Sequence, residues 1–172
     1  DVLATMLPPI AKALEDAGCE LRGGPECQRV YPMKRATPED WRTEYLAPII
    51  AIRAVGGEVW VDGGHNPGAG EVIAEAMAGF EERQSRPLYL ITGMINTKDP
   101  VGYFRAFADI AQDVFTVPIR GTDAGLDPVA LAQSAFDAGL VATPVSTVAE
   151  ALEELKTRLD PDMPAPRILI GG

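Results

Sequence analysis

The sequence predicts an α/β fold: a doubly wound, Rossmann-like, mostly parallel sheet with an N-terminal helix and one or two extra strands added at an edge. From Gly56 onward, short apolar runs alternate with amphipathic segments, which is typical of right-handed crossovers in a parallel sheet. A glycine-rich turn separates the first of these strands from its helix, as in nucleotide- and phosphate-binding α/β folds. The 172 residues are 47% hydrophobic, which favours a packed domain over a disordered chain.

The N-terminal third of the chain is less regular than the rest. Apolar residues at spacings of three and four predict a helix over residues 2–17, which Pro8-Pro9 delays or kinks. Residues 19–22 are typical of a short strand, and residues 45–54 of an apolar strand with a proline near its start. We expect these elements to join one edge of the sheet.

The remaining elements follow in alternation. We expect strands at residues 58–62, 87–92, 113–118, 140–144 and 167–170. We expect helices at about residues 69–83, 99–111, 127–138 and 147–159. Asn66-Pro67 favours a helix start, because proline fits the first helical turn.

The net charge of the chain changes near the point where the regular alternation of strands and helices begins. Residues 1–54 carry a net charge of −1 and residues 55–172 a net charge of −9. We therefore predict two pieces, 1–54 and 55–172, in one compact unit or a segment-exchanged oligomer. The total of −10 argues against general binding of nucleic acid or anionic membranes.

Neither a membrane span nor a signal peptide is visible in the sequence, so we expect a cytoplasmic protein. The only cysteines, Cys19 and Cys27, match no zinc pattern. We interpret them as free thiols in a reducing compartment, with an opportunistic disulfide as the alternative. No metal site is predicted.

The candidate site is the glycine turn after the first regular strand. Asp62 ends that strand, Gly63 and Gly64 permit close backbone approach, and His65 is the only histidine. At the carboxyl edge of a parallel sheet, free N–H groups and a helix N-terminus can hold an anion. Asp62 would serve as an acceptor or would orient a metal ligand, and His65 as donor, acceptor or ligand. The alternative is a tight turn in which Asp62 caps the helix and His65 is solvated.

Several motifs around this turn resemble a known family. They are Trp-Val-Asp-Gly-Gly-His-Asn-Pro at 60–67, Leu-Ile-Thr-Gly-Met-Ile-Asn-Thr-Lys-Asp at 90–99, Val-Pro-Ile at 117–119 and the closing Arg-Ile-Leu-Ile-Gly-Gly. Together they resemble the C-terminal domain of folylpolyglutamate synthase/dihydrofolate synthase, a relative of the Mur ligases. The resemblance covers about residues 56–172.

In that family the Asp-Gly-x-His-Asn-Pro segment lies at the interface with the ATP-binding domain, close to the γ-phosphate and the incoming glutamate. The resemblance therefore implies positions near substrate or phosphate for five residues: Asp62, His65, Asn66, Lys98 and Asp99. For Lys98 and Asp99, the alternative is a helix N-cap by Thr97 or Asp99 beside a solvated lysine.

The family makes an acyl phosphate from a folate carboxylate and ATP, which the glutamate amine then attacks. A helix N-terminus and a cationic or neutral His65 near that phosphate would stabilise the developing charge. The complete enzymes use ATP and Mg²⁺, but Gly-x-x-x-x-Gly-Lys-Ser/Thr is absent from these 172 residues, and so is the central domain that holds the nucleotide. We therefore expect no turnover and no cofactor for this chain alone, and glutamate or phosphate as its candidate ligands.

The front of the chain resembles another family. The matching segments are residues 7–14, 19–23 and 36–49. They resemble part of the catalytic domain of γ-glutamyl phosphate reductase (glutamate-5-semialdehyde dehydrogenase), of the aldehyde dehydrogenase group. There, the residue corresponding to Glu44 lies near the nicotinamide ribose, whereas the nucleophilic cysteine lies upstream, so neither Cys19 nor Cys27 inherits its role. No Gly-x-Gly-x-x-Gly follows a strand, which argues against an NAD-dependent reductase.

The two resemblances together indicate a chimera or fusion, and they leave two functional hypotheses. In the first, the chain is the glutamate-side domain of a folate-type amide ligase and acts only with a separate nucleotide-binding partner. In the second, it is a folded chimera without catalytic activity. Exposed former domain interfaces, such as Trp41, Tyr45 and the apolar run at 46–50, would then favour a homo-oligomer.

Overall fold

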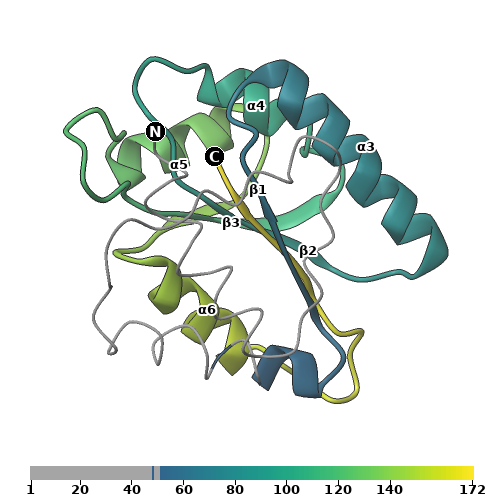
Figure 1. Ribbon diagram of the computed structural model, residues 1–172. Coiled ribbons are helices and arrows are strands. Elements are labelled where there is room, and N and C mark those ends of the chain that lie inside the picture. The colour runs from purple at the N-terminus through teal and green to yellow at the C-terminus, as the bar shows by residue number, and fades with distance from the viewer. Residues whose placement is uncertain (1–47, 49–50) are drawn as a thin grey trace, which may run out of the picture.

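The computed structural model describes residue 48 and residues 51–172. Nine helices and strands are bounded within this part (Figure 1). The strands are β1 (Glu58–Asp62), β2 (Leu88–Thr92), β3 (Ala111–Thr116), β4 (Ala142–Pro144) and β5 (Arg167–Gly171). The helices are α3 (Pro67–Arg83), α4 (Pro100–Arg105), α5 (Pro128–Asp137) and α6 (Val148–Thr157).

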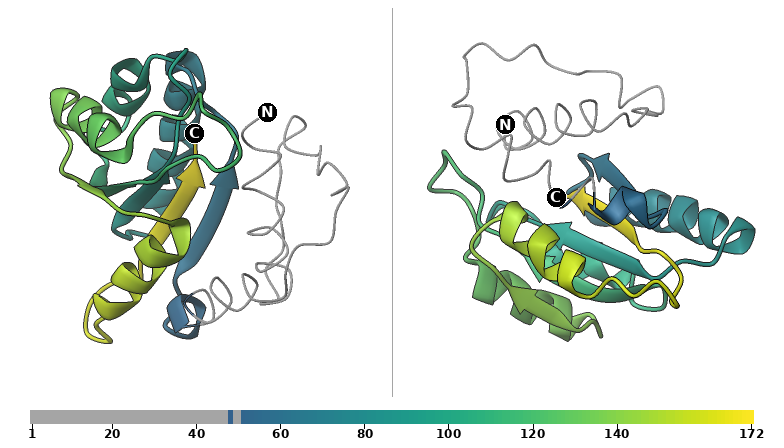
Figure 2. Two further views of the ribbon diagram at one scale, coloured as in Figure 1. Left: turned by 90° about the vertical axis from the view of Figure 1, so that its left-hand side faces the viewer. Right: turned by 90° about the horizontal axis from the view of Figure 1, so that it is seen from below.

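The strands form one parallel sheet in the order β1-β5-β2-β3-β4. The chain crosses from β1 to β4 through α3, α4 and α5, and then returns through α6 to place β5 between β1 and β2. Figure 2 shows this return, with β5 in yellow beside β1 in blue. The expected doubly wound α/β sheet is confirmed.

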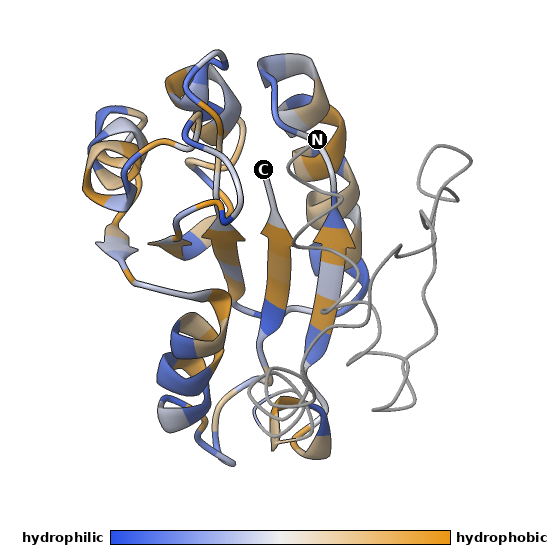
Figure 3. Cartoon of the chain, turned by 60° about the vertical axis from the view of Figure 1, so that its left-hand side comes forward, coloured by the Kyte–Doolittle hydropathy of each residue, from blue (hydrophilic) through white to orange (hydrophobic). Residues whose placement is uncertain are grey.

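Each face of the sheet has its own apolar core. The larger core lies under α3, α4 and α5 and includes Met77, Phe104, Leu131 and Leu169. The smaller one lies under α6 and includes Ile52, Phe115, Leu152 and Ile168. Figure 3 shows the apolar stretches of the strands between their more hydrophilic ends. Alternate residues of each strand therefore point into different cores.

Ion pairs close the amino edge of the sheet. Arg167, at the start of β5, is 2% exposed, and its Nε donates to Glu58 Oε2 at 2.8 Å. Its guanidinium also lies over the Phe80 ring, 5.5 Å from the centroid. Arg86 approaches the other oxygen of Glu58, Nε to Oε1 at 3.3 Å, and donates to Gly56 O at 2.6 Å. This cluster connects the beginnings of β1 and β5 with the segment that enters β2.

The five strands and four helices after position 56 are confirmed within a few residues, with one clear exception. The expected helix over 99–111 ends at Arg105 as α4, and β3 begins at Ala111 rather than 113. Between them the backbone forms successive three-residue turns, such as Phe107 N to Phe104 O at 2.9 Å. A three-residue turn repeats almost as a helix does, so the apolar spacing alone does not distinguish them.

The strand expected over 45–54 is wrong where the structure describes it, because residues 51–54 are helical. Ile52 is fully buried in the smaller core, and burial on all sides makes a short helix look like a strand in sequence. Gly56, with φ +83°, then turns the chain into β1.

Some expectations fall on residues outside the described part. These are the helix over 2–17, the strand over 19–22, both cysteines, Trp41 and Tyr45. Among the residues that are described, no helix combines the length and the apolar character that a membrane crossing requires.

Candidate functional site

The glycine turn between β1 and α3 is held by its own side chains. Asp62 Oδ1 accepts a hydrogen bond from Gly64 N at 2.7 Å. His65 Nδ1 lies 3.1 Å from Gly63 O, so this nitrogen donates and a neutral ring keeps Nε2 as an acceptor. His65 is half-buried. A Cβ on Gly64 would stand 2.5 Å from Ile73 Cδ1, so only glycine fits there without displacing the core.

The helix cap is Asn66. Its Oδ1 accepts from Ala69 N at 3.0 Å, and Pro67 opens the helix. The alternative in which Asp62 caps α3 is therefore wrong, because Asp62 bonds within the turn. With Asn66 as the cap, the side chain of Asp62 shapes the turn that precedes α3 rather than the helix start.

The second candidate segment, Lys98-Asp99, lies at the start of α4. Asp99 is its N-cap, and its Oδ1 accepts from Gly102 N at 2.9 Å. The backbone N–H of Lys98 donates to Ile95 O at 3.2 Å. A Cβ on Gly102 would lie 2.7 Å from Pro67 Cγ, so the first turns of α3 and α4 are in contact. The two segments that the sequence singles out thus meet at one corner.

The loops after β2 and β3 are paired with each other above the sheet. Ile95 and Gly125 form an antiparallel bridge, Asn96 N donates to Ala124 O at 2.8 Å, and Leu126 N donates to Met94 O at 2.8 Å. This pairing fixes the loop that carries Lys98. Arg120, an exposed residue in the second loop, lies at the same edge and was missed by sequence reasoning.

The last residues of the strands form a polar row on the sheet face that α3 and α4 cover. In register, Asp62 of β1 pairs with Gly171 of β5, which pairs with Thr92 of β2, which in turn pairs with Thr116 of β3. The latter two are 1% and 0% exposed. Thr116 Oγ1 donates to Pro128 O at 2.7 Å. The period of two along each strand could have revealed part of this row, because β1, β2 and β3 each end in a polar residue.

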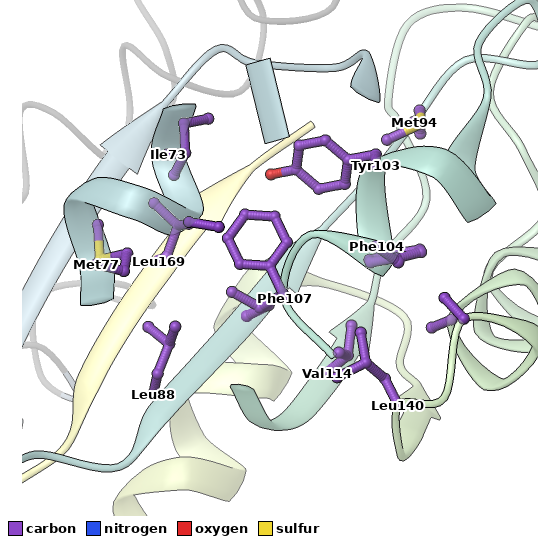
Figure 4. Close-up of a cluster of buried hydrophobic side chains, with 14 of the residues drawn as sticks. Ile73, Met77, Leu88, Met94, Tyr103, Phe104, Phe107, Val114, Leu140 and Leu169 are labelled. Carbon is purple, nitrogen blue, oxygen red and sulfur yellow. The ribbon is translucent and has the colours of Figure 1, made fainter. Parts of the chain in front are cut away.

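Tyr103 of α4 brings a hydroxyl to the same place. Its ring lies in the larger core and is 1% exposed. Figure 4 shows its hydroxyl turned toward the end of β5, and a Cβ on Gly171 would lie 3.9 Å from that oxygen. Burial raises the pKa of Tyr103 well above its ordinary value, and the charge of Asp62 raises it further. The hydroxyl therefore stays protonated, and it can both donate and accept.

The geometry thus places the five predicted residues at the carboxyl edge but gives four of them structural roles. Asn66 and Asp99 are helix caps, and Asp62 and His65 shape the turn. Lys98 is fixed there through its backbone N–H, which donates to Ile95 O. The arrangement offers a carboxylate, an imidazole and a helix N-terminus, which suits a small ligand with both negative and positive groups. No cluster of three or more metal-binding side chains occurs within residues 51–172.

No protein-family model matches the chain. Short stretches match curated enzymes. Over 53 residues, the chain is 58% identical to the γ-glutamyl phosphate reductase of Caulobacter vibrioides, and over 56 residues it is 52% identical to that of Rhizobium johnstonii. These stretches make up 30% and 32% of this chain but only 13% of each reductase.

Solved structures match a larger share of the chain. Folylpolyglutamate synthase of Mycobacterium tuberculosis, complexed with ADP and AMPPCP, aligns with 80% of the chain at a TM-score of 0.55 and 21% identity. E. coli FolC in complex with DHPP and ADP aligns with 80% at a TM-score of 0.54 and 19% identity. The chain covers 33% and 32% of these proteins, about a third of their length. Its fold is thus that of one part of a folylpolyglutamate synthase, and its sequence also contains a reductase-like stretch.

Proposed function

We propose that the chain supplies the glutamate- and phosphate-side domain of an ATP-dependent folate–glutamate amide ligase and does not turn over alone. The observation that carries this proposal is the corner where the β1–α3 turn meets the first turn of α4. There Asp62 and His65 lie just before the N-terminus of the 17-residue helix α3, and a helix N-terminus suits an anionic group. The likeness to folylpolyglutamate synthases solved with ADP supports the same assignment.

The residues at this corner suggest which part of the substrate each would bind. His65 Nδ1 is oriented by Gly63 O, so in a neutral ring Nε2 would be the nitrogen that accepts from a ligand. The positive end of α3 would stabilise the negative charge of an acyl phosphate. The nucleotide would be bound elsewhere, because these 172 residues contain no Gly-x-x-x-x-Gly-Lys-Ser/Thr motif.

Residues 1–54 are, in this proposal, a fragment related to γ-glutamyl phosphate reductase and joined to the ligase-type domain. The reductase match is 53 residues long, which agrees with the length of the segment before the charge and rhythm change near Gly56. The chain would then be a fusion of two fragments. A homo-oligomer through former domain interfaces belongs to the same proposal.

The test is a ligand-dependent melt followed by a reconstitution assay. We expect millimolar glutamate or phosphate to raise the melting temperature of the chain, because a ligand stabilises the state that binds it. His65→Ala should abolish the rise, whereas Gln133→Ala, on the exposed side of α5, should leave it intact. The chain alone should release no ADP from ATP with folate and glutamate, and a separately supplied ATP-binding domain should restore release.

The alternative of a folded chimera without activity predicts the opposite pattern. Its melt would be cooperative but indifferent to glutamate, phosphate, ATP and Mg²⁺, and no ATP-binding domain would restore turnover. This alternative also predicts a homo-oligomer. Size exclusion with light scattering over a concentration series tests that prediction, since a strictly monomeric chain contradicts assembly through exposed apolar interfaces.

A further inference from the structure

The outward face of α5 is apolar. The helix packs Leu131 and Ala135 into the larger core, but Val129 on its other side is 64% exposed and Phe136 is 70% exposed. These two residues are about two turns apart, so their side chains lie on the same side of the helix. Val141, just before β4, is 67% exposed. A surface helix normally directs polar residues outward, so this apolar face is typical of a surface that another molecule covers.

The same part of the chain carries almost no charge. Charged residues make up 23% of the chain, but between positions 128 and 149 Asp137 is the only one. Asp137 Oδ1 accepts a hydrogen bond from Gln133 Nε2 at 2.8 Å, so it is paired within α5. The whole chain has a net charge of −10, and two copies of an acidic chain repel each other. Segment 128–149 is therefore a place where two copies can approach with little repulsion.

The strand beside α5 offers little to a partner strand. β4 lies at one end of the described sheet, has only three residues and ends in Pro144, which has no backbone N–H. A short edge strand with a proline resists the addition of another strand. A contact between two copies on this side is therefore made by helix side chains and not by extension of the sheet.

We infer that α5 forms a weak two-fold dimer with α5 of a second copy of this chain. The inference goes beyond the proposed function and does not depend on it. In a two-fold interface each surface contacts its own equivalent, so the surface must be self-complementary. Val129 and Phe136 lie one turn before and one turn after Gln133. Two antiparallel α5 helices that cross near Gln133 therefore place Phe136 of each copy against Val129 of the other.

The inferred contact is small. α5 has 10 residues, so it is about 15 Å long and, with its side chains, about 10 Å wide. Stable complexes bury about 800 Å² on each partner, and one helix of this length does not reach that area. Two contacts between Phe136 and Val129 still remove apolar surface from water. We therefore expect a dissociation constant on the order of 100 μM, and not a permanent dimer.

Sedimentation equilibrium of the full chain from about 10 μM to about 1 mM tests the inference. We expect the parent to pass from monomer to dimer over this range. Phe136→Glu should weaken association at least about tenfold, because each of the two contacts would then bury a carboxylate without a partner. Val72→Glu is the matched control, since Val72 of α3 is 68% exposed and its replacement changes the net charge equally. It should associate like the parent, and all three proteins should melt at similar temperatures.

A mixing experiment tests the antiparallel arrangement. Val129→Lys alone should also associate at least about tenfold more weakly than the parent. An equimolar mixture of Phe136→Glu and Val129→Lys should instead dimerise within about threefold of the parent affinity. The mixed pair brings a carboxylate against an ammonium at one contact and keeps Phe136 against Val129 at the other.

Three outcomes would overturn the inference. A parent chain that stays monomeric at every concentration would exclude the dimer. Association that Phe136→Glu leaves unchanged would exclude α5 and assign the contact to another part of the chain. A mixture of the two variants that stays monomeric would exclude the antiparallel pairing of Phe136 with Val129.

Discussion

Charged side chains make different kinds of contact at the amino and carboxyl edges of the sheet. At the amino edge, Arg167, Glu58 and Arg86 pair with one another and with backbone carbonyls. At the carboxyl edge, Asp62 Oδ1 accepts from Gly64 N and His65 Nδ1 lies 3.1 Å from Gly63 O, and α3 begins directly after this turn. Polar groups at the amino edge therefore hold strands to one another, whereas those at the carboxyl edge shape the turn between a strand and a helix, where we propose that a ligand binds.

We expect the largest effect from removing Arg167 at the amino edge. Arg167→Met should destabilise the chain by about 3 kcal/mol, because it leaves Glu58 without its closest partner and strips a cation from Phe80. Urea unfolding measures the loss. Arg158→Met is the control. Arg158 pairs with Asp113 and Glu154, but its side chain is 37% exposed, so we expect less than about 1 kcal/mol. Equal losses would mean that the amino edge is not a structural clamp.

A pair of glycine substitutions compares the turn with the helix that follows it. Gly64→Ala should cost about 1–3 kcal/mol, since its Cβ would collide with Ile73 and stand 3.2 Å from Asp62 Oδ1. Gly79→Ala, within α3 and with nothing within 4 Å, should instead stabilise by about 0.5–1 kcal/mol. Thermal melts of both variants decide the matter. A tolerated Gly64→Ala would show that the turn adjusts without loss.

Two substitutions of Asp99 distinguish its role as a helix cap from a role in ligand binding. Asp99→Ala should cost about 1 kcal/mol as a lost N-cap, and Asp99→Asn should retain stability because asparagine caps equally well. Glutamate or phosphate binding should then be compared between the parent and Asp99→Asn. Unchanged binding would restrict Asp99 to capping, whereas altered binding would assign its charge to the ligand. Asp127→Ala, the cap of α5, gives the stability reference.

The smallest expected effect is a pH dependence at the amino edge. Partial burial raises the pKa of Glu58, but hydrogen bonds from Arg167 and Trp60 and the charges of Arg167 and Arg86 outweigh it and hold the pKa below its ordinary value of 4.5. A lowered pKa contributes stability that is present above pH 4.5 and lost as the pH falls through the lowered value.

Unfolding free energies between pH 6 and pH 3 test this contribution. Glu58→Gln should fall less steeply with acid than the parent, whereas Glu153→Gln, at an exposed position of α6, should follow the parent curve. Parallel curves for all three proteins would contradict a role for Glu58 in acid sensitivity.

The glycine turn and the regular elements can be predicted from the sequence because their signals are local. Asn66-Pro67 marks a helix start by its own chemistry, and alternating strands and helices imply a parallel sheet. The end of α4 at Arg105 cannot be predicted in this way, since the turns that follow keep a helix-like spacing. The placement of Asp62 and Thr92 on either side of Gly171 is not predictable either, because the order of the strands brings together residues that are far apart in the chain.

Arg167 illustrates the same limit. Its sequence neighbours show only the start of an apolar strand, yet its main partner is Glu58, 109 residues earlier. A single arginine before a strand usually lies on the surface. Only the return of the chain through α6 turns it into a buried residue.

The position of β5 also has a consequence for biosynthesis. The strand that lies between β1 and β2 is the last of the described strands to leave the ribosome. Until then β1 has no partner among these strands, and β2 lacks one of its two neighbours. At about 5–20 residues per second, roughly a hundred residues separate the synthesis of β1 from that of its partner, an interval of seconds. During that interval an unpaired apolar strand is open to chaperones or to the β1 of another nascent chain.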